Sequence, residues 1–219
     1  MNKYLKESVL WVLIVLPYVY LAAIWDKLPV QVPTHFDIEG AADSWSNKST
    51  FLFIIGGFGI GIYVLMLLIP FIDPKKKIRQ MGEKYYTLRF TLTFFFSLLA
   101  ILLIYMSKAN GVDHHNMLFA LIGALFAMLG NYFQAVRPNY FIGIRTPWTL
   151  ENEQVWKKTH RLGGQLWMVG GVLIAILAFF INNPNTSSII FGIIISLMII
   201  VPVVFSYTEF KKVRKILNQ

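Results

Sequence analysis

The placement of charged residues constrains this fold most, because it leaves five long stretches of the 219-residue chain without Asp, Glu, Lys or Arg. Four of them, at 8–25, 49–72, 90–107 and 114–136, hold 18 to 24 residues each, which is the length of one membrane-crossing helix. The fifth, 162–208, is twice as long and is interrupted at 182–188 by the polar sequence NNPNTSS, where Pro184 marks a turn. The sequence therefore predicts an all-α membrane protein with six transmembrane helices.

Composition agrees with this prediction and excludes several classes of protein. Apolar residues make up 56% of the chain and charged residues only 14%, whereas a soluble domain carries about 25% charged residues. Cys is absent, so thiolate catalysis and Cys-ligated metals are excluded. We find no HExxH motif, no pair of intramembrane Asp residues and no nucleophile with its base. The sequence thus predicts no catalytic residue, no metal and no cofactor.

The basic residues are divided unequally between alternate segments of the predicted topology. The two termini, the loop after the second helix and the loop after the fourth hold 17 Lys and Arg residues, and the other three loops hold three. The positive-inside rule therefore predicts that both termini lie in the cytoplasm. Topology and anionic membrane lipids account for the net charge of +9, and no direct contact with nucleic acid is needed to explain it.

The loop predicted to lie outside, residues 28–50, is richer than a simple connector. Pro29 and Pro33 favour an extended backbone, and Gly40 and Asp43 favour a turn. Trp45 is suited to the lipid headgroup boundary. His35, Asp37 and Glu39 alternate, so on a strand they would share one face. A metal site is one interpretation, but a hydrated acidic loop is favoured because no second His lies nearby.

The loop predicted to lie inside, residues 137–164, concentrates the most unusual sequence. Thr149, followed by Glu153 and Gln154, resembles a helix start, from which a short amphipathic helix would carry Trp148 and Trp156 at the membrane interface. Arg145 lies beside Thr146 and Trp148. It either binds a carboxylate or phosphate or only anchors the loop, and anchoring is favoured on sequence alone.

Two sets of small and polar residues lie within the predicted helices. Gly57 and Gly61 in the second helix, and four glycines in the fifth, predict close helix packing inside the monomer. Asn131 and Gln134 stand three residues apart in the fourth helix. They either form hydrogen bonds across helices or line a polar pocket.

The inner loop resembles the signature of the SdpI-type immunity proteins, a family of multispanning bacterial membrane proteins that protect toxin producers from a peptide toxin. The residues that carry this resemblance are Asn139, Gly143, Ile144, Arg145, Thr146, Pro147, Trp148, Thr149 and Trp156, continued by Thr159, His160, Arg161 and Gly164. The outer loop is similar to an amino-terminal module that is often joined to this family, through Pro29, Pro33, His35, Gly40, Asp43, Trp45 and Lys48. The resemblance thus divides the chain into an amino-terminal module, 1–72, and an SdpI-type region, 73–219.

The resemblance implies a function in the bacterial plasma membrane. The expected partners are a secreted peptide toxin and, in the family's best-known setting, a cytoplasmic transcriptional repressor held at the membrane. The alternative is a small permease or channel-like transport subunit, but the uninterrupted spans lack the charged midplane residue that carriers usually have. Arg145 is predicted to be the most sensitive position in the chain, because Lys cannot reproduce the planar contacts of a guanidinium.

Overall fold

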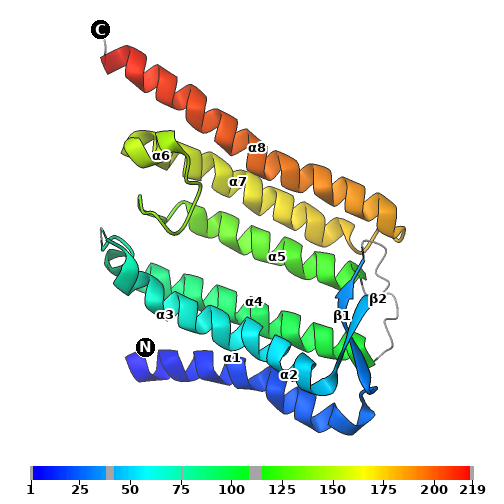
Figure 1. The fold of residues 1–219 in the computed structure, drawn as a ribbon. Coiled ribbons are helices and arrows are strands. Elements are labelled where there is room, and N and C mark those ends of the chain that lie inside the picture. The colour runs from blue at the N-terminus through cyan, green and yellow to red at the C-terminus, as the bar shows by residue number, and fades with distance from the viewer. Residues whose placement is uncertain (1, 38–41, 75, 109–114, 218–219) are drawn as a thin grey trace.

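The computed structural model describes residues 2–37, 42–74, 76–108 and 115–217, and the long helices predicted from the sequence are present in it (Figure 1). Within this part of the chain, six helical segments are long and apolar enough to cross a membrane. Five are single helices: α1 (Lys3–Ile24), α4 (Glu83–Lys108), α5 (His115–Phe133), α7 (Glu153–Leu177) and α8 (Pro184–Leu217). The remaining segment joins α2 (Lys48–Gly56) to α3 (Ile62–Ile72) through the π-helical turn η2 (Gly57–Gly61). Short helical turns are η1 (Trp25–Lys27), η3 (Arg79–Met81) and α6 (Pro147–Glu151).

The connections alternate between two ends of the molecule, as six crossings require. Figure 1 shows both termini, the α3–α4 connection and α6 at one end, which we call the basic end. The strands and the turn between α7 and α8 lie at the other, the hairpin end. The grouping of loops on which the 17-to-3 asymmetry depends is therefore confirmed, and the cytoplasmic location of the basic end stays a prediction.

The outer loop folds as a β-hairpin, so the prediction of a purely helical protein is corrected there. Strand β1 (Gln31–Phe36) pairs antiparallel with β2 (Ala42–Asn47), and Pro33 lies opposite Trp45. Asn47 ends the hairpin and begins α2, since its side-chain oxygen accepts a hydrogen bond from the Thr50 amide at 2.9 Å. The extended backbone imposed by the prolines explains why a polar segment between two membrane helices forms strands.

Helices α5 and α7 approach each other more closely than ordinary side chains allow, because glycines face each other at two levels. A Cβ atom added to Gly164 would stand 2.6 Å from the carbonyl oxygen of Gly130. One added to Gly123 would stand 2.6 Å from that of Gly171. Each helix therefore carries two glycines, seven residues apart, on the same face. In lipid no hydrophobic force drives helices together, so helices associate through the close packing that such small residues allow.

The GxxxG pair of the second crossing does not pack as predicted. A Cβ atom on Gly57 or Gly61 would meet nothing within 4 Å, so both glycines face away from the neighbouring helices. Gly56 and Gly59 make the approach to α1 instead, against Tyr18 and Ile14. The prediction of internal packing holds for the fifth-crossing glycines and is wrong for Gly57 and Gly61.

A largely buried ion pair joins α1 to α4 near the basic end. Both terminal nitrogens of Arg89 donate to the Glu7 carboxylate at 2.9 Å, and the Tyr63 hydroxyl donates to the same carboxylate at 2.8 Å. Arg89 directly precedes the uncharged stretch 90–107, so the sequence predicts that it is a loop residue, but it lies within α4 and is only 9% exposed. Opposite charge and a bidentate geometry compensate for its removal from water.

The orientation can be tested directly because the chain has no Cys. Ser44→Cys on the hairpin and Gln154→Cys at the start of α7 both replace exposed side chains at opposite ends. In intact cells, we expect a membrane-impermeant maleimide to label Ser44→Cys and to spare Gln154→Cys until the cells are opened. The reverse pattern would overturn the predicted orientation.

The α5–α7 contact predicts a strongly position-dependent effect of adding one methyl group. Gly130→Ala should lower the stability of the purified protein by ~1–3 kcal/mol, the usual cost of overpacking. Gly192→Ala, on α8 with nothing within 4 Å of the added carbon, serves as the control and should leave stability equal or slightly higher. Thermal unfolding in detergent measures both, and equal melting temperatures would refute the tight contact.

Candidate functional site

The signature segment leaves α5 and returns to α7 in a loop that Asn139 shapes from within. Its side chain is 1% exposed, and its oxygen accepts hydrogen bonds from the amides of Phe141 and Ile142 at 2.8 and 2.7 Å. Its amide nitrogen donates to the carbonyl oxygens of Arg137 and Ile142. An Asn can satisfy backbone donors and acceptors at once, which explains why this residue type is needed at the entry to the loop.

Gly143 and His160 form the second fixed point of the loop. The Ile144 amide donates to His160 Nε2 at 2.9 Å, and Nδ1 lies 2.9 Å from the carbonyl oxygen of Trp156. Because Nε2 accepts, the imidazole is neutral and carries its proton on Nδ1, which donates to Trp156. Gly143 has a φ of +110°, and any Cβ there would overlap His160 Nε2. Only Gly suits both the backbone angle and the approach of the ring.

Trp156 connects the end of α5 to the start of α7. Its indole nitrogen donates to the Val136 carbonyl oxygen at 2.8 Å, and its ring stacks on His160 with centroids 4.0 Å apart. The side chain is completely buried inside the protein, so the prediction that Trp156 lies on the outer face of a short amphipathic helix is wrong. The reason is that Trp156 belongs to the first turn of α7, which begins at Glu153, and lies on the face of this helix that packs against α5.

Thr146 and Thr149 begin α6 with a reciprocal cap. Thr146 Oγ1 accepts from the Thr149 amide at 3.2 Å, and Thr149 Oγ1 accepts from the Thr146 amide at 2.9 Å, with Pro147 at the first helical position. Thr146 also contacts the Ser206 hydroxyl on α8 at 3.1 Å. The helix start predicted at Thr149 is thus three residues too late. A separate cap at Asn152 begins α7, so a single amphipathic helix does not form.

Arg145, Pro147 and Arg161 are the exposed residues of the signature, and Trp148 is half-buried. Arg145 is exposed and donates to the carbonyl oxygen of Tyr140, and Arg161 is exposed on α7. The Trp148 ring packs against Tyr207 of α8, with centroids 5.0 Å apart. The structure therefore brings Trp148 to α8, while the indole of Trp156 is stacked on His160 instead of lying under Arg145.

Asn131 and Gln134 are exposed and line two neighbouring hollows beside α4. Of the two alternatives left open by the sequence, the structure supports a polar hollow.

The hairpin carries the outer group of predicted residues. His35 Nδ1 lies 2.6 Å from Asp43 Oδ1 across the two strands, and both side chains are largely exposed. Pro33 is buried, whereas Trp45 is 54% exposed. Strand β1 ends at Phe36, so Asp37 does not continue the strand with His35, and Gly40 and Glu39 lie outside the described residues. Among the described residues, no three His, Asp or Glu side chains come together as a metal would require.

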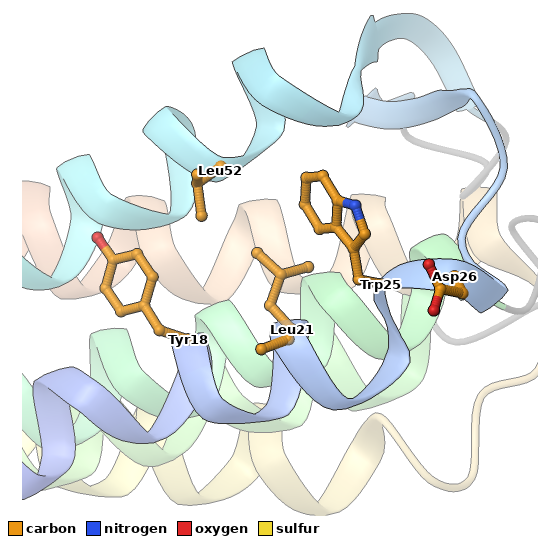
Figure 2. Close-up of a pocket in the computed structure, with 6 residues that line it drawn as sticks. Tyr18, Leu21, Trp25, Asp26 and Leu52 are labelled. Atoms are coloured by element: carbon orange, nitrogen blue, oxygen red, sulfur yellow. The ribbon is translucent and has the colours of Figure 1, made fainter.

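An open hollow of about 440 Å³ lies beside the hairpin, between α1 and α2. Figure 2 shows Tyr18 and Leu21 of α1 and Trp25 of η1 pointing towards Leu52 on α2, with Asp26 at the end nearest the strands. Lys48 holds Trp25 in place, because its ammonium group donates to the Trp25 carbonyl oxygen at 2.9 Å and lies 5.6 Å from the centre of the Trp25 ring. The hollow combines an apolar wall with one carboxylate at its outer end.

Comparison with known proteins agrees with the signature. Residues 135–208 match the SdpI/YfhL protein family. This region of the chain belongs to the SdpI/YfhL family. Residues 12–60 match a domain of unknown function, DUF1648. The family is not a known enzyme family, and with six membrane-capable helices the chain is a multi-pass membrane protein. The division between residues 72 and 73 stays a prediction.

One relative is the immunity protein SdpI of Bacillus subtilis (strain 168), which is 34% identical over 91 residues. The aligned part covers 42% of this chain and 43% of the relative, less than half the length of either. No solved structure matches the chain.

The geometry at Gly143 predicts a non-additive effect on stability. Gly143→Ala should cost ~1–3 kcal/mol, since it combines an unfavourable φ with an overlap on His160. His160→Ala should also destabilise the protein, by removing two hydrogen bonds. The double variant should lose less than the sum of both, because the overlap disappears with the ring. Thermal unfolding in detergent measures the cycle, and additive losses would show that the two residues do not meet.

Proposed function

We propose that the chain is an integral membrane immunity protein that protects the bacterium carrying it from a secreted peptide toxin. The observation that carries this proposal is the SdpI/YfhL region, together with the 34% identity to a protein named as an immunity protein. The architecture supports it, since the chain combines folded surfaces at both ends with helices that present no chemistry of their own. A protein that intercepts a toxin needs a shaped surface and no catalytic group.

The toxin would meet the hairpin end, for which the basic asymmetry predicts a location outside the cell. Trp45 on the hairpin offers an exposed indole, and the His35–Asp43 pair lies beside it. The hollow lined by Trp25, Tyr18 and Asp26 continues from the hairpin towards the membrane. Together these surfaces suit an amphipathic peptide, whose apolar side chains would enter the hollow and whose polar groups would contact the strands.

The basic end would serve a cytoplasmic partner, and a transcriptional repressor held at the membrane is the partner that the family resemblance implies. Arg145 and Arg161 are the exposed charged side chains of the signature, and Trp148 is half-buried. A protein with an acidic surface would suit them, because Arg and Trp are the residues that most often dominate binding energy at interfaces.

Protection can be measured as growth. A sensitive host is grown in the culture supernatant of the toxin-producing strain that encodes this chain, with and without expression of the chain. We expect expression to restore growth, and Trp45→Ala to weaken protection by about tenfold in the tolerated dose, equivalent to the ~1.4 kcal/mol of one lost aromatic contact. Membrane abundance of each variant is measured alongside.

Ser44→Ala is the matched control, because it removes an exposed side chain from the neighbouring position of the same strand. It should protect like the wild type. Absence of protection by the abundant wild-type chain would contradict the immunity function. Full protection by Trp45→Ala would contradict only the role of the hairpin.

A further inference from the structure

Two adjoining hollows form a continuous groove at the basic end, and Lys84 and Ala135 line both of them. The larger hollow, of about 590 Å³, lies among the α3–α4 connection, the end of α5 and the start of α7. The smaller, of about 340 Å³, continues along α4 and α5 past Thr91, Met128 and Tyr132. The groove therefore changes from polar to apolar in the direction of the membrane interior.

The polar hollow is lined by more positive than negative groups. Its cations are Lys77, Lys84, Arg137 and Lys157, and its carboxylates are Glu151 and Glu153. Glu153 pairs with Lys157 at 2.9 Å, and it also interacts electrostatically with Lys77 and Arg137. This leaves a surplus of positive charge gathered around one cavity.

Three basic groups elsewhere at this end are held in ion pairs. Lys6 pairs with Glu83, Arg89 with Glu7, and Lys158 with Glu209. Lys77, Lys84 and Arg137 form no ion pair within the described part of the chain. Because no described carboxylate neutralises these three groups through an ion pair, the cations of the groove have room for an anion from outside.

We propose that this groove binds an anionic phospholipid. Its phosphate lies between Lys77, Lys84 and Arg137, and one acyl chain lies along α4 and α5 against Met128 and Tyr132. A free phosphate would use the polar hollow alone, whereas a lipid explains both the charge and the apolar continuation. Basic pockets between transmembrane helices are suited to anionic lipid headgroups, and Lys side chains near helix ends reach the headgroup level.

The site also has a structural consequence. Lys84 belongs to α4 and Arg137 directly follows α5, so one phosphate held between them would join the amino-terminal helices to the carboxyl-terminal ones. Asn131 and Gln134 line the two hollows and can donate to the ester and phosphate oxygens of such a lipid. This inference does not depend on the immunity function.

The test measures binding of phosphatidylglycerol to the purified full-length chain by native mass spectrometry, with phosphatidylcholine as the neutral comparison. We expect phosphatidylglycerol to bind more tightly. Lys84→Gln combined with Arg137→Gln should weaken it by about 25-fold, since each cation near a lipid surface contributes about fivefold, or ~1 kcal/mol. Arg214→Gln combined with Lys215→Gln, exposed cations of α8 away from the groove, is the control and should bind like the wild type.

The acyl-chain half of the groove is tested by filling it. Met128→Trp should weaken phosphatidylglycerol binding, while Met117→Trp, an equally exposed methionine of α5 outside the groove, should leave it unchanged. Glycerol phosphate without acyl chains should not compete at the same concentration. Equal binding of both lipids, equal loss in the α8 control, or effective competition by glycerol phosphate would each overturn the proposal.

Discussion

The close contact between α5 and α7 is the constraint on which the signature loop depends. Gly130 faces Gly164 and Gly123 faces Gly171 across an interface with no room for side chains. This approach brings the first turns of α7 beside the last turn of α5, so that the Trp156 indole can reach the Val136 carbonyl oxygen. A wider separation would move the indole out of hydrogen-bonding range, and His160, one turn further along α7, would no longer hold the Ile144 amide.

Most of the signature is used to hold its own shape. Asn139, His160, Thr146 and Thr149 direct their hydrogen bonds into the loop backbone, the caps of α6 or neighbouring helices. A buried polar group in a membrane protein must be paired, because lipid offers no substitute for water. Most polar residues of the signature are thus explained by structure, and the completely buried Thr159 hydroxyl is the exception, since it has no hydrogen-bond partner among the described residues. Recognition by a partner falls to the side chains that remain exposed, above all Arg145.

The sequence predicted the positions of the membrane-crossing helices well and the side-chain contacts between them poorly. Each helix could be located from uncharged length alone, since lipid selects for that property directly. Arg89 and Glu7 could not be assigned, because a charge at a helix end resembles a loop residue until its partner, 82 residues away, is known. The burial of Trp156 could not be predicted either, because it depends on which face of α7 meets α5, and the sequence alone does not show this. The hairpin was not predicted, because strand pairing depends on two short segments together. Pro29 and Pro33 did indicate an extended backbone.

An influence of the β-hairpin on the signature loop can pass from the first crossings to the later ones, and the packing indicates one place where this can occur. Phe141 and Ile142 of the loop pack against a buried cluster that includes Met66 of α3 and Tyr85 of α4. The Tyr85 hydroxyl donates to the Met66 carbonyl oxygen at 2.5 Å, which ties these two helices together beneath the loop. A displacement of the second crossing, which begins directly at the hairpin, would therefore reach Phe141 and Ile142 before it reached Arg145. Hydrogen bonds hold the shape of the loop, whereas apolar contacts hold the loop against α3 and α4. Apolar contacts can shift without leaving a polar group unpaired.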